Sequence, residues 1–227
     1  MGTDDIFKKR KQDRKKRQIE MKTPKPNSYL IVAEGEKTEP LYFQGIVDKI
    51  IEKVGGNITV YPIPTIDIHG EGCSTNSLID KAEEIVNKAK IIYEKIWIIF
   101  DKDDFEDFDS AIDRALKKGY HVGWSNECFE YWLYLHFFYS DSSLHRDDWF
   151  DKVDDIFKKY GLGDGKYKKN EARIFDLLNN AGSVKSAIGY AKNRMKEFNQ
   201  SERKPSEFNP GTTVHILVEE LLRYLED

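Results

Sequence analysis

The sequence predicts an α/β fold: a mostly parallel four-stranded sheet flanked by helices, followed by a helical C-terminal extension. Two observations lead to this class. Short apolar runs alternate with helical segments, as in right-handed strand–helix–strand units. The most apolar run, residues 96–100, has hydrophobic residues at successive positions, as expected for a strand buried on both faces of a parallel sheet.

The 227 residues suit one full domain with an extension. We expect a basic tail at 1–27, an α/β core at 28–138 and a helical extension at 139–227 that packs on the core. A hydrophobic content of 39% without a long apolar run excludes a disordered chain and a membrane span. Two distant cysteines and a charged N-terminus without a signal peptide predict a cytoplasmic protein.

Charge divides the chain into two parts. Residues 1–26 hold ten basic and four acidic residues, a net of +6, whereas the remainder holds 26 basic and 36 acidic residues, a net of -10. Such a basic block is either an arm for nucleic acid or a solubilising tail. The candidate nucleic-acid contacts are Lys8, Lys9, Arg10, Lys11, Arg14, Lys15, Lys16 and Arg17.

The first half of the chain reads as alternating strands and helices. Residues 28–33 form a buried-strand pattern, and Gly35 permits a sharp turn before a helix that ends near Val54. A second strand is expected at 58–61, stopped by the prolines that follow. The glycine-rich segment 69–75 is expected to be a loop, because it lacks the spacing of a phosphate-binding motif. Further helices are expected at 76–89 and 108–118, and further strands at 96–100 and 120–125.

After the fourth strand the chain is expected to be helical. The apolar segment 131–138 continues the alternation, and no strand is expected beyond Trp149. The sequence 209–213 is a good entry to the last helix and needs no catalytic explanation. The expected C-terminal helices lie near 149–160, 170–180, 183–198 and 212–225.

Acidic residues follow the ends of two buried strands. Glu34 follows the first strand, and Asp101 and Asp103 follow the strand at 96–100. The carboxyl ends of parallel strands border the ligand crevice of an open sheet, so these carboxylates would repel one another unless a cation neutralises them. Oxygen ligands of this kind suit Mg²⁺ or Mn²⁺. Loop acids with ordinary ion pairs are the alternative, and Asp104 is a further metal ligand or a solvated loop acid.

Three further residues are candidates for site support. Glu130 follows the fourth strand, where it either takes part in catalysis or interacts with a helix dipole. Asn126 lies at the same strand end. His215 lies one turn into a helix, where it either approaches the acids or packs in the core. The lysines available to hold a phosphate are Lys37, Lys102, Lys166, Lys168, Lys169 and Lys185.

Four sequence blocks together resemble the RloB family. They are the Val32–Phe43 block, the Phe100–Phe105 block, the Ser125–Leu133 block and the Asn209–His215 block. The family is similar to Toprim domains, which carry a glutamate after the first strand and a DxD pair after a later one. The resemblance therefore implies that Glu34, Asp101 and Asp103 are metal ligands or general acid/base groups.

The resemblance also implies a function. Proteins of this kind occur in restriction-linked and phage-defence loci beside AAA or ABC-type ATPases, and related Toprim effectors are nucleases, some acting on tRNA. We therefore expect a Mg²⁺-dependent nuclease for RNA or DNA that acts with an ATPase in abortive infection. The alternative is a non-catalytic nucleic-acid-binding or regulatory subunit that controls the ATPase. Primase or topoisomerase activity is disfavoured, because no zinc-binding segment or strand-passage domain fits in the chain.

Overall fold

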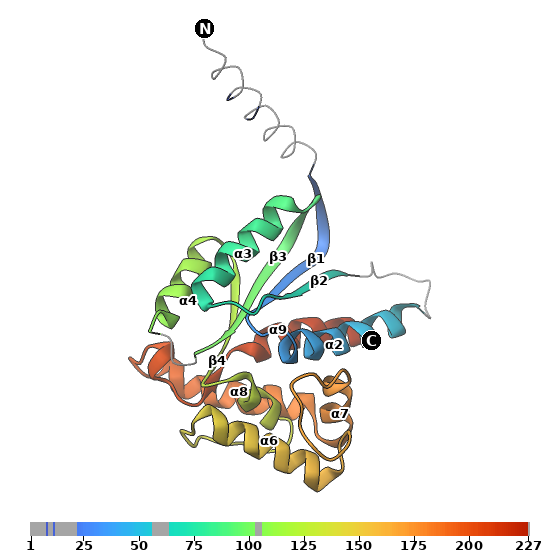
Figure 1. Cartoon of the computed structure of the whole chain (residues 1–227), viewed down its shortest axis with the longest axis vertical. Helices are drawn as coiled ribbons and strands as arrows, with labels where there is room; N and C mark the ends of the chain where they lie inside the picture. The colour runs from blue at the N-terminus through green and yellow to red at the C-terminus, as the bar shows by residue number, and fades with distance from the viewer. Residues whose placement is uncertain (1–7, 9–10, 12–21, 56–63, 103–105, 227) are drawn as a thin grey trace.

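The computed structural model describes residues 8, 11, 22–55, 64–102 and 106–226. Its centre is a sheet of five strands in the order β2-β1-β3-β4-β5. The first four strands run parallel to one another, and β5 is antiparallel to β4. The α/β class and the flanking helices are therefore confirmed (Figure 1). The strands are β1 Thr23–Ala33, β2 Thr65–Gly70, β3 Ile91–Asp101, β4 His121–Asn126 and β5 Gly211–Thr212.

Helices cover both faces of this sheet. Helices α3 and α4 lie on one side, whereas α2 and α9 lie on the other, with α6, α7 and α8 farther along (Figure 1). The helices up to β4 and just after it are α2 Thr38–Gly55, α3 Thr75–Lys88, α4 Phe108–Lys117 and α5 Phe129–Tyr134. The later helices are α6 Arg146–Tyr160, α7 Ile174–Ala181, α8 Val184–Asn199 and α9 Val214–Leu222, with 3₁₀ turns at Pro205–Glu207 and Arg223–Leu225.

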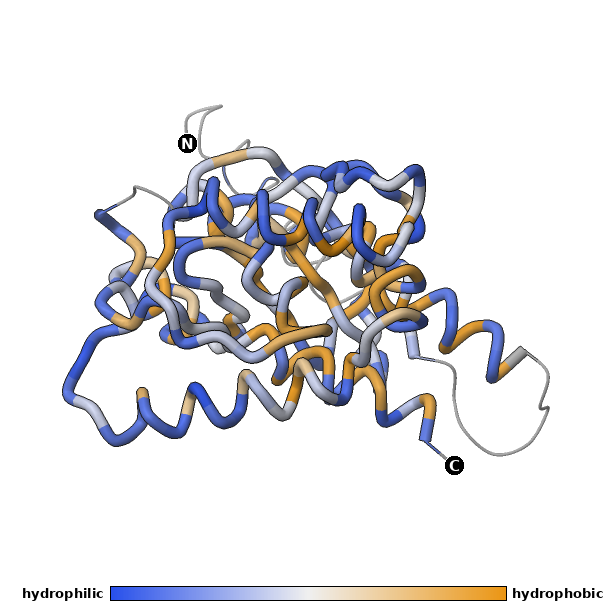
Figure 2. Tube along the Cα trace, turned by 90° about the horizontal axis from the view of Figure 1, so that it is seen from below, coloured by the Kyte–Doolittle hydropathy of each residue, from blue (hydrophilic) through white to orange (hydrophobic). Residues whose placement is uncertain are grey.

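The predicted burial of the central strands on both faces is confirmed. In β1, Leu30 and Val32 pack with α3 and α4, whereas Ile31 and Ala33 pack with α2 and the C-terminal helices. All four side chains are buried. Because successive side chains of a strand point to opposite faces, only an uninterrupted apolar run fills both layers of core. Figure 2 places hydrophobic residues toward the centre and hydrophilic ones on the outer turns.

The second strand differs from the prediction. The strand expected at 58–61 lies outside the described residues. The second strand of the described sheet is β2 at 65–70, whose end was expected to be loop. In β2 the isoleucines Ile66 and Ile68 alternate with polar residues, and every side chain before Gly70 is half-buried. This is the pattern of an edge strand, which a search for continuous apolar runs misses. In addition, β1 already begins at Thr23 and pairs with the start of β3.

The C-terminal half contains one strand that was not expected. Gly211 and Thr212 pair antiparallel with Asn126 and Ser125, and α9 begins only at Val214. A two-residue strand has no periodicity for a sequence pattern to reveal. The other expected helices are present as α6, α7 and α8. In the described part of the chain, none of the helices combines the length and apolar character needed to cross a membrane.

Candidate functional site

The acids Glu34 and Asp101 lie side by side at the carboxyl edge of the sheet. The neighbours β1 and β3 pair in parallel with Ala33 opposite Ile99, so the residues that follow both strands meet at one edge. The Glu34 backbone N–H donates to the Ile99 carbonyl at 2.8 Å. In return, the Asp101 N–H donates to Glu34 Oε2 at 3.3 Å, and Thr75 Oγ1 donates to Glu34 Oε1 at 3.3 Å.

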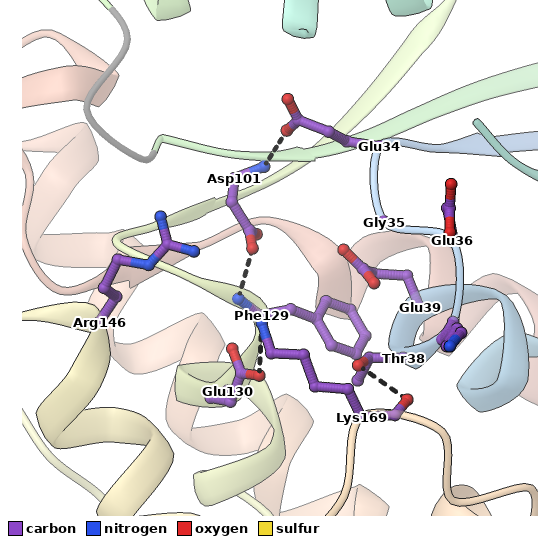
Figure 3. A pocket seen from close by; sticks show the side chains of 11 residues that line it. Glu34, Gly35, Glu36, Thr38, Glu39, Asp101, Phe129, Glu130, Arg146 and Lys169 are labelled. Carbon is purple, nitrogen blue, oxygen red and sulfur yellow. Dashed lines mark hydrogen bonds and ion pairs between the residues drawn. The ribbon is translucent and has the colours of Figure 1, made fainter. Parts of the chain in front are cut away.

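A pocket with a volume of about 420 Å³ opens beside these two acids. Its walls come from the β1–α2 turn, the end of β3, the start of α5, the start of α6 and the loop before α7. Figure 3 shows the carboxylates of Asp101 and Glu39, and the cationic ends of Arg146 and Lys169, directed into this region. The lining residues are Glu34, Gly35, Glu36, Lys37, Thr38, Glu39, Asp101, Phe129, Glu130, Arg146 and Lys169.

The side chain of Asp101 also connects β3 to α5. Its Oδ2 accepts a hydrogen bond of 3.0 Å from the backbone N–H of Phe129, the first residue of that helix. The first N–H groups of a helix have no partner within the helix, so a carboxylate there stabilises the helix start. Asp101 is therefore both a structural residue and a candidate for chemistry.

Glu130 is buried in the pocket wall, with 4% of its surface exposed. Its Oε1 accepts a hydrogen bond of 3.0 Å from the Tyr167 hydroxyl and lies 3.6 Å from Lys169 Nζ. Burial raises the pKa of Tyr167 well above its ordinary value, and the charge of Glu130 adds to this. The Tyr167 hydroxyl therefore keeps its proton and donates a hydrogen bond to the buried Glu130 carboxylate, which is also close to Lys169.

Glu39 is a second buried carboxylate, and the sequence analysis did not select it. Burial raises its pKa to about 7, and the nearby charge of Glu130 adds to the increase, while Lys169 opposes it. Gly35 makes room for Glu39, because a Cβ at that glycine would collide with the Glu39 carboxylate. Glu39 therefore exchanges its proton near neutral pH in the middle of the pocket.

The structure separates two predicted support residues from the pocket lining. Asn126 is buried at the end of β4, where its Nδ2 donates to the carbonyls of Pro205 and Ser206, both at 3.0 Å. His215 is buried in α9, and its Nδ1 lies 3.1 Å from the Thr212 carbonyl oxygen. Burial lowers the pKa of His215 to about 4. In the described pocket, neither residue is part of the lining.

Two of the predicted metal ligands, Asp103 and Asp104, lie outside the described residues. Within the described ranges, no group of three or more His, Cys, Asp or Glu side chains is arranged to hold a metal ion. The part of the predicted metal site that can be placed therefore consists of Glu34 and Asp101.

The basic residues that were predicted to contact phosphate lie in different parts of the structure. Lys37 and Lys169 line the pocket, whereas Lys168 is exposed and pairs with Asp164. In the N-terminal tail, Lys8 and Lys11 are exposed. The other tail candidates, Lys9, Arg10, Arg14, Lys15, Lys16 and Arg17, lie outside the described residues.

Sequence reasoning missed three charged residues of the pocket lining, Glu36, Glu39 and Arg146. Glu39 lies in the first turn of α2, where an acid normally needs no explanation beyond the helix dipole. Arg146 is the first residue of α6, after a loop without a recognisable pattern. The nearest available signal was the Thr38-Glu39-Pro40 helix start, which placed Glu39 beside the turn that carries Glu34.

Comparison with known proteins gives one result. No match was found among curated proteins or among solved structures. The model of the family described as RloB-like protein matches residues 29–221, which include the whole sheet from Tyr29 onward and the pocket-lining residues. The match covers most of the chain and includes the four blocks on which the resemblance was based. The chain therefore belongs to the RloB-like family.

Proposed function

We propose that this protein is a metal-dependent nuclease that hydrolyses phosphodiester bonds of RNA or DNA at the edge of the sheet formed by Glu34 and Asp101. The observation that carries the proposal is the pairing of these two strand-end acids through the Asp101 N–H and Glu34 Oε2, beside a pocket. In an open parallel sheet this is the edge at which ligands bind. Membership of the RloB-like family is consistent with the proposal.

The donor chemistry of the two acids fits Mg²⁺ or Mn²⁺. Among the described residues, five acidic and three basic side chains line the pocket, an excess of negative charge that a cation would offset. Each carboxylate oxygen has two lone pairs, so it can accept a hydrogen bond and bind a cation at the same time. Mg²⁺ is commonly held by one or two carboxylates together with waters and substrate phosphates. In this proposal Glu34 and Asp101 hold the ion, with Asp103 as a further ligand.

The surrounding residues would orient these acids during the reaction. A bound Mg²⁺ would polarise the phosphodiester and lower the pKa of an attacking water. Thr75 and the Asp101 N–H hold the two Glu34 oxygens, and the Phe129 N–H holds Asp101 Oδ2. Glu39 exchanges a proton near neutral pH and is therefore suited to accept a proton from the attacking water or to return one to the leaving oxygen.

The proposal includes the setting that the family resemblance implies. We place the nuclease in an anti-phage abortive-infection system, where an ATPase partner restrains or activates it, with tRNA among the substrates to be tested. The basic N-terminal tail would supply additional contacts to nucleic acid.

Calorimetric Mn²⁺ binding to the wild-type chain and to Asp101→Asn is the first test, because it requires neither substrate nor partner. Asn keeps an oxygen to accept from the Phe129 N–H but removes the charge that binds the ion. The proposal expects Mn²⁺ binding by the wild type only. It also expects the wild type to cleave RNA or DNA in the presence of Mg²⁺, and the ATPase is added to this assay if the chain alone shows no cleavage. Asp113→Asn, on the exposed side of α4, is the matched control.

Equal Mn²⁺ binding by wild type and Asp101→Asn would remove Asp101 from the metal site. Absence of Mn²⁺ binding, combined with absence of cleavage in the presence of the ATPase, would favour the second candidate function. That candidate is a regulatory or nucleic-acid-binding subunit, and the net charge of +6 on residues 1–26 is the observation in its favour.

A further inference from the structure

Two cations from the C-terminal half of the chain reach the pocket beside the strand-end acids. Arg146 begins α6, and Lys169 lies in the loop between α6 and α7. Both line the cavity that Glu34 and Asp101 also line. Figure 3 shows the Arg146 guanidinium and the Lys169 side chain approaching Asp101 from the α6 side and from the α6–α7 loop. Two of the pocket acids thus lie at strand ends, whereas two of its cations come from elements later in the chain.

Lys169 is held in position by several contacts. The Thr38 hydroxyl donates to the Lys169 backbone carbonyl at 3.1 Å and thereby connects the loop to the start of α2. The neighbouring Tyr167 is buried, and its backbone N–H donates to Asp154 Oδ1 at 2.8 Å. Glu130 Oε1 lies 3.6 Å from Lys169 Nζ. The ammonium therefore belongs to a preorganised site and is not an ordinary surface lysine.

The local field keeps Lys169 charged. Burial alone would lower its pKa, but the negative charges of Glu130, Glu39 and Asp101 outweigh this effect and raise the pKa. The side chain nevertheless keeps 56% of its surface exposed, whereas that of Glu130 keeps 6%. A ligand that enters the pocket can therefore reach the ammonium while Glu130 remains behind it.

We propose that Lys169 and Arg146 form a phosphate-binding subsite for the backbone of a single nucleic-acid strand, with Glu130 as the residue that positions Lys169. The identity of the ligand as nucleic acid rests on the proposed function. A planar guanidinium forms paired hydrogen bonds to phosphate oxygens, and an ammonium supplies a compact charge with three donors. Two different cations in one pocket are suited to bind a backbone phosphate. This phosphate would be the neighbour of the one that is hydrolysed beside Glu34 and Asp101.

Neighbouring lysines do not have the same setting. Lys168 directly precedes Lys169 and is similarly exposed, with 51% of its side-chain surface accessible, but it pairs with Asp164 and is not among the lining residues of the described pocket. Lys37 lines the pocket from the β1–α2 turn and is exposed. The pair Lys168 and Lys169 therefore offers two lysines of equal charge and nearly equal place in the sequence, of which only one faces the cavity.

The test is calorimetric binding of a phosphorylated dinucleotide, pUpU and its DNA counterpart pTpT, to the full-length chain in EDTA. A short probe limits the contribution of the basic tail, and all variants carry the same tail, so differences among them report on the pocket. Lys169→Met and Arg146→Met should each weaken binding about tenfold, the loss expected for a charge-assisted hydrogen bond. Lys168→Met should match the wild type, and Lys169→Arg should keep most of the affinity.

Glu130 is tested through its positioning role. Glu130→Gln should weaken dinucleotide binding in the wild-type background but have no further effect in the Lys169→Met background, since a residue that acts through Lys169 has nothing left to position. Circular dichroism confirms that each variant is folded. Equal binding by Lys168→Met and Lys169→Met, or absence of binding by the wild type at low ionic strength, overturns the subsite.

Failure of the subsite and failure of the nuclease are distinguishable. Because EDTA removes the metal, dinucleotide binding reports on the subsite separately from metal-dependent cleavage. Binding that depends on Lys169 in a chain that cleaves nothing would keep the subsite and reject the nuclease. Cleavage by the wild type, with Lys169→Met binding and cleaving equally well, would keep the nuclease and reject the subsite.

Discussion

The carboxylate of Asp101 accepts a 3.0 Å hydrogen bond from the backbone N–H of Phe129, so a candidate metal ligand also secures the start of α5. Phe129 is buried among the aromatic rings of Tyr42 and Phe43. A substitution at Asp101 therefore alters both the fold and the chemistry, and the two effects separate only when the new side chain keeps the acceptor.

Substitutions at Asp101 should separate into two classes. Asp101→Ala leaves the Phe129 N–H without its acceptor and should lower the free energy of unfolding by about 1–3 kcal/mol. Asp101→Asn should lower it by less, because an amide oxygen still accepts from that N–H. Urea denaturation monitored by circular dichroism measures both. Equal losses for the two variants would mean that the Phe129 hydrogen bond does not stabilise the protein.

Glu39→Gln should change how stability depends on pH. In the native state the pKa of Glu39 is raised by burial from 4.5 to about 7, so between these values the native chain holds a proton that the unfolded chain has lost. The contribution of Glu39 to the stability of the wild type therefore falls as pH rises through this window. A neutral glutamine removes this contribution, so its stability relative to the wild type should rise by about 3 kcal/mol from about pH 4 to about pH 8.

The matched control for Glu39 is Glu36→Gln. Glu36 is an exposed acid of the same turn, and its substitution should leave the pH profile of stability close to that of the wild type. Denaturation midpoints across the pH range give the comparison. Parallel profiles for wild type and Glu39→Gln would show that the carboxyl is not protonated in the native state near neutral pH.

The elements that follow from local pattern were predictable from the sequence. The apolar runs that contain Leu30 and Ile98 identify strands buried on both faces, and parallel pairing brings Glu34 and Asp101 to one edge. Neither inference needs information about distant contacts. The two strand-end acids of the pocket were predictable for this reason, whereas Glu39 was not.

The cationic side of the pocket depends on long-range contacts that have no local signature. Lys169 reaches the acids because its carbonyl accepts from Thr38, 131 positions earlier. β5 pairs two residues with the end of β4, and the buried Glu39 lines a pocket to which Glu130 and Lys169 also contribute. Such contacts depend on tertiary packing, which periodicity and turn chemistry do not encode.

Tyr42→Phe should destabilise the junction between α2 and the segment after α5. The Tyr42 hydroxyl lies 2.9 Å from His136 Nε2, and both residues are buried. Burial lowers the pKa of His136 to about 3, so the ring is neutral. Removing the hydroxyl leaves a buried ring nitrogen unpaired, which should cost about 1–3 kcal/mol of stability.

The control for Tyr42 is Tyr160→Phe. Tyr160 is 41% exposed at the end of α6, and loss of its hydroxyl should change stability by less than about 0.5 kcal/mol. Thermal and urea denaturation of the two variants give the comparison. Similar stabilities would indicate that water replaces the Tyr42 hydroxyl at the histidine.

Substitution of two glycines by alanine should have opposite effects, because the glycines differ in their surroundings. A Cβ at Gly182 would lie 2.6 Å from the His136 carbonyl oxygen and 3.0 Å from that of Leu178, so backbone would have to move. Gly182→Ala should therefore destabilise the protein by about 1–3 kcal/mol. Gly189 is exposed within α8 and has nothing within 4 Å of its added Cβ. Gly189→Ala should instead stabilise the protein by about 0.5–1 kcal/mol, because alanine favours the helix. Urea denaturation of both variants tests the contrast. A change in the free energy of unfolding of the same sign in both variants would mean that the backbone at the α7–α8 junction moves to accommodate the added Cβ without a loss of stability.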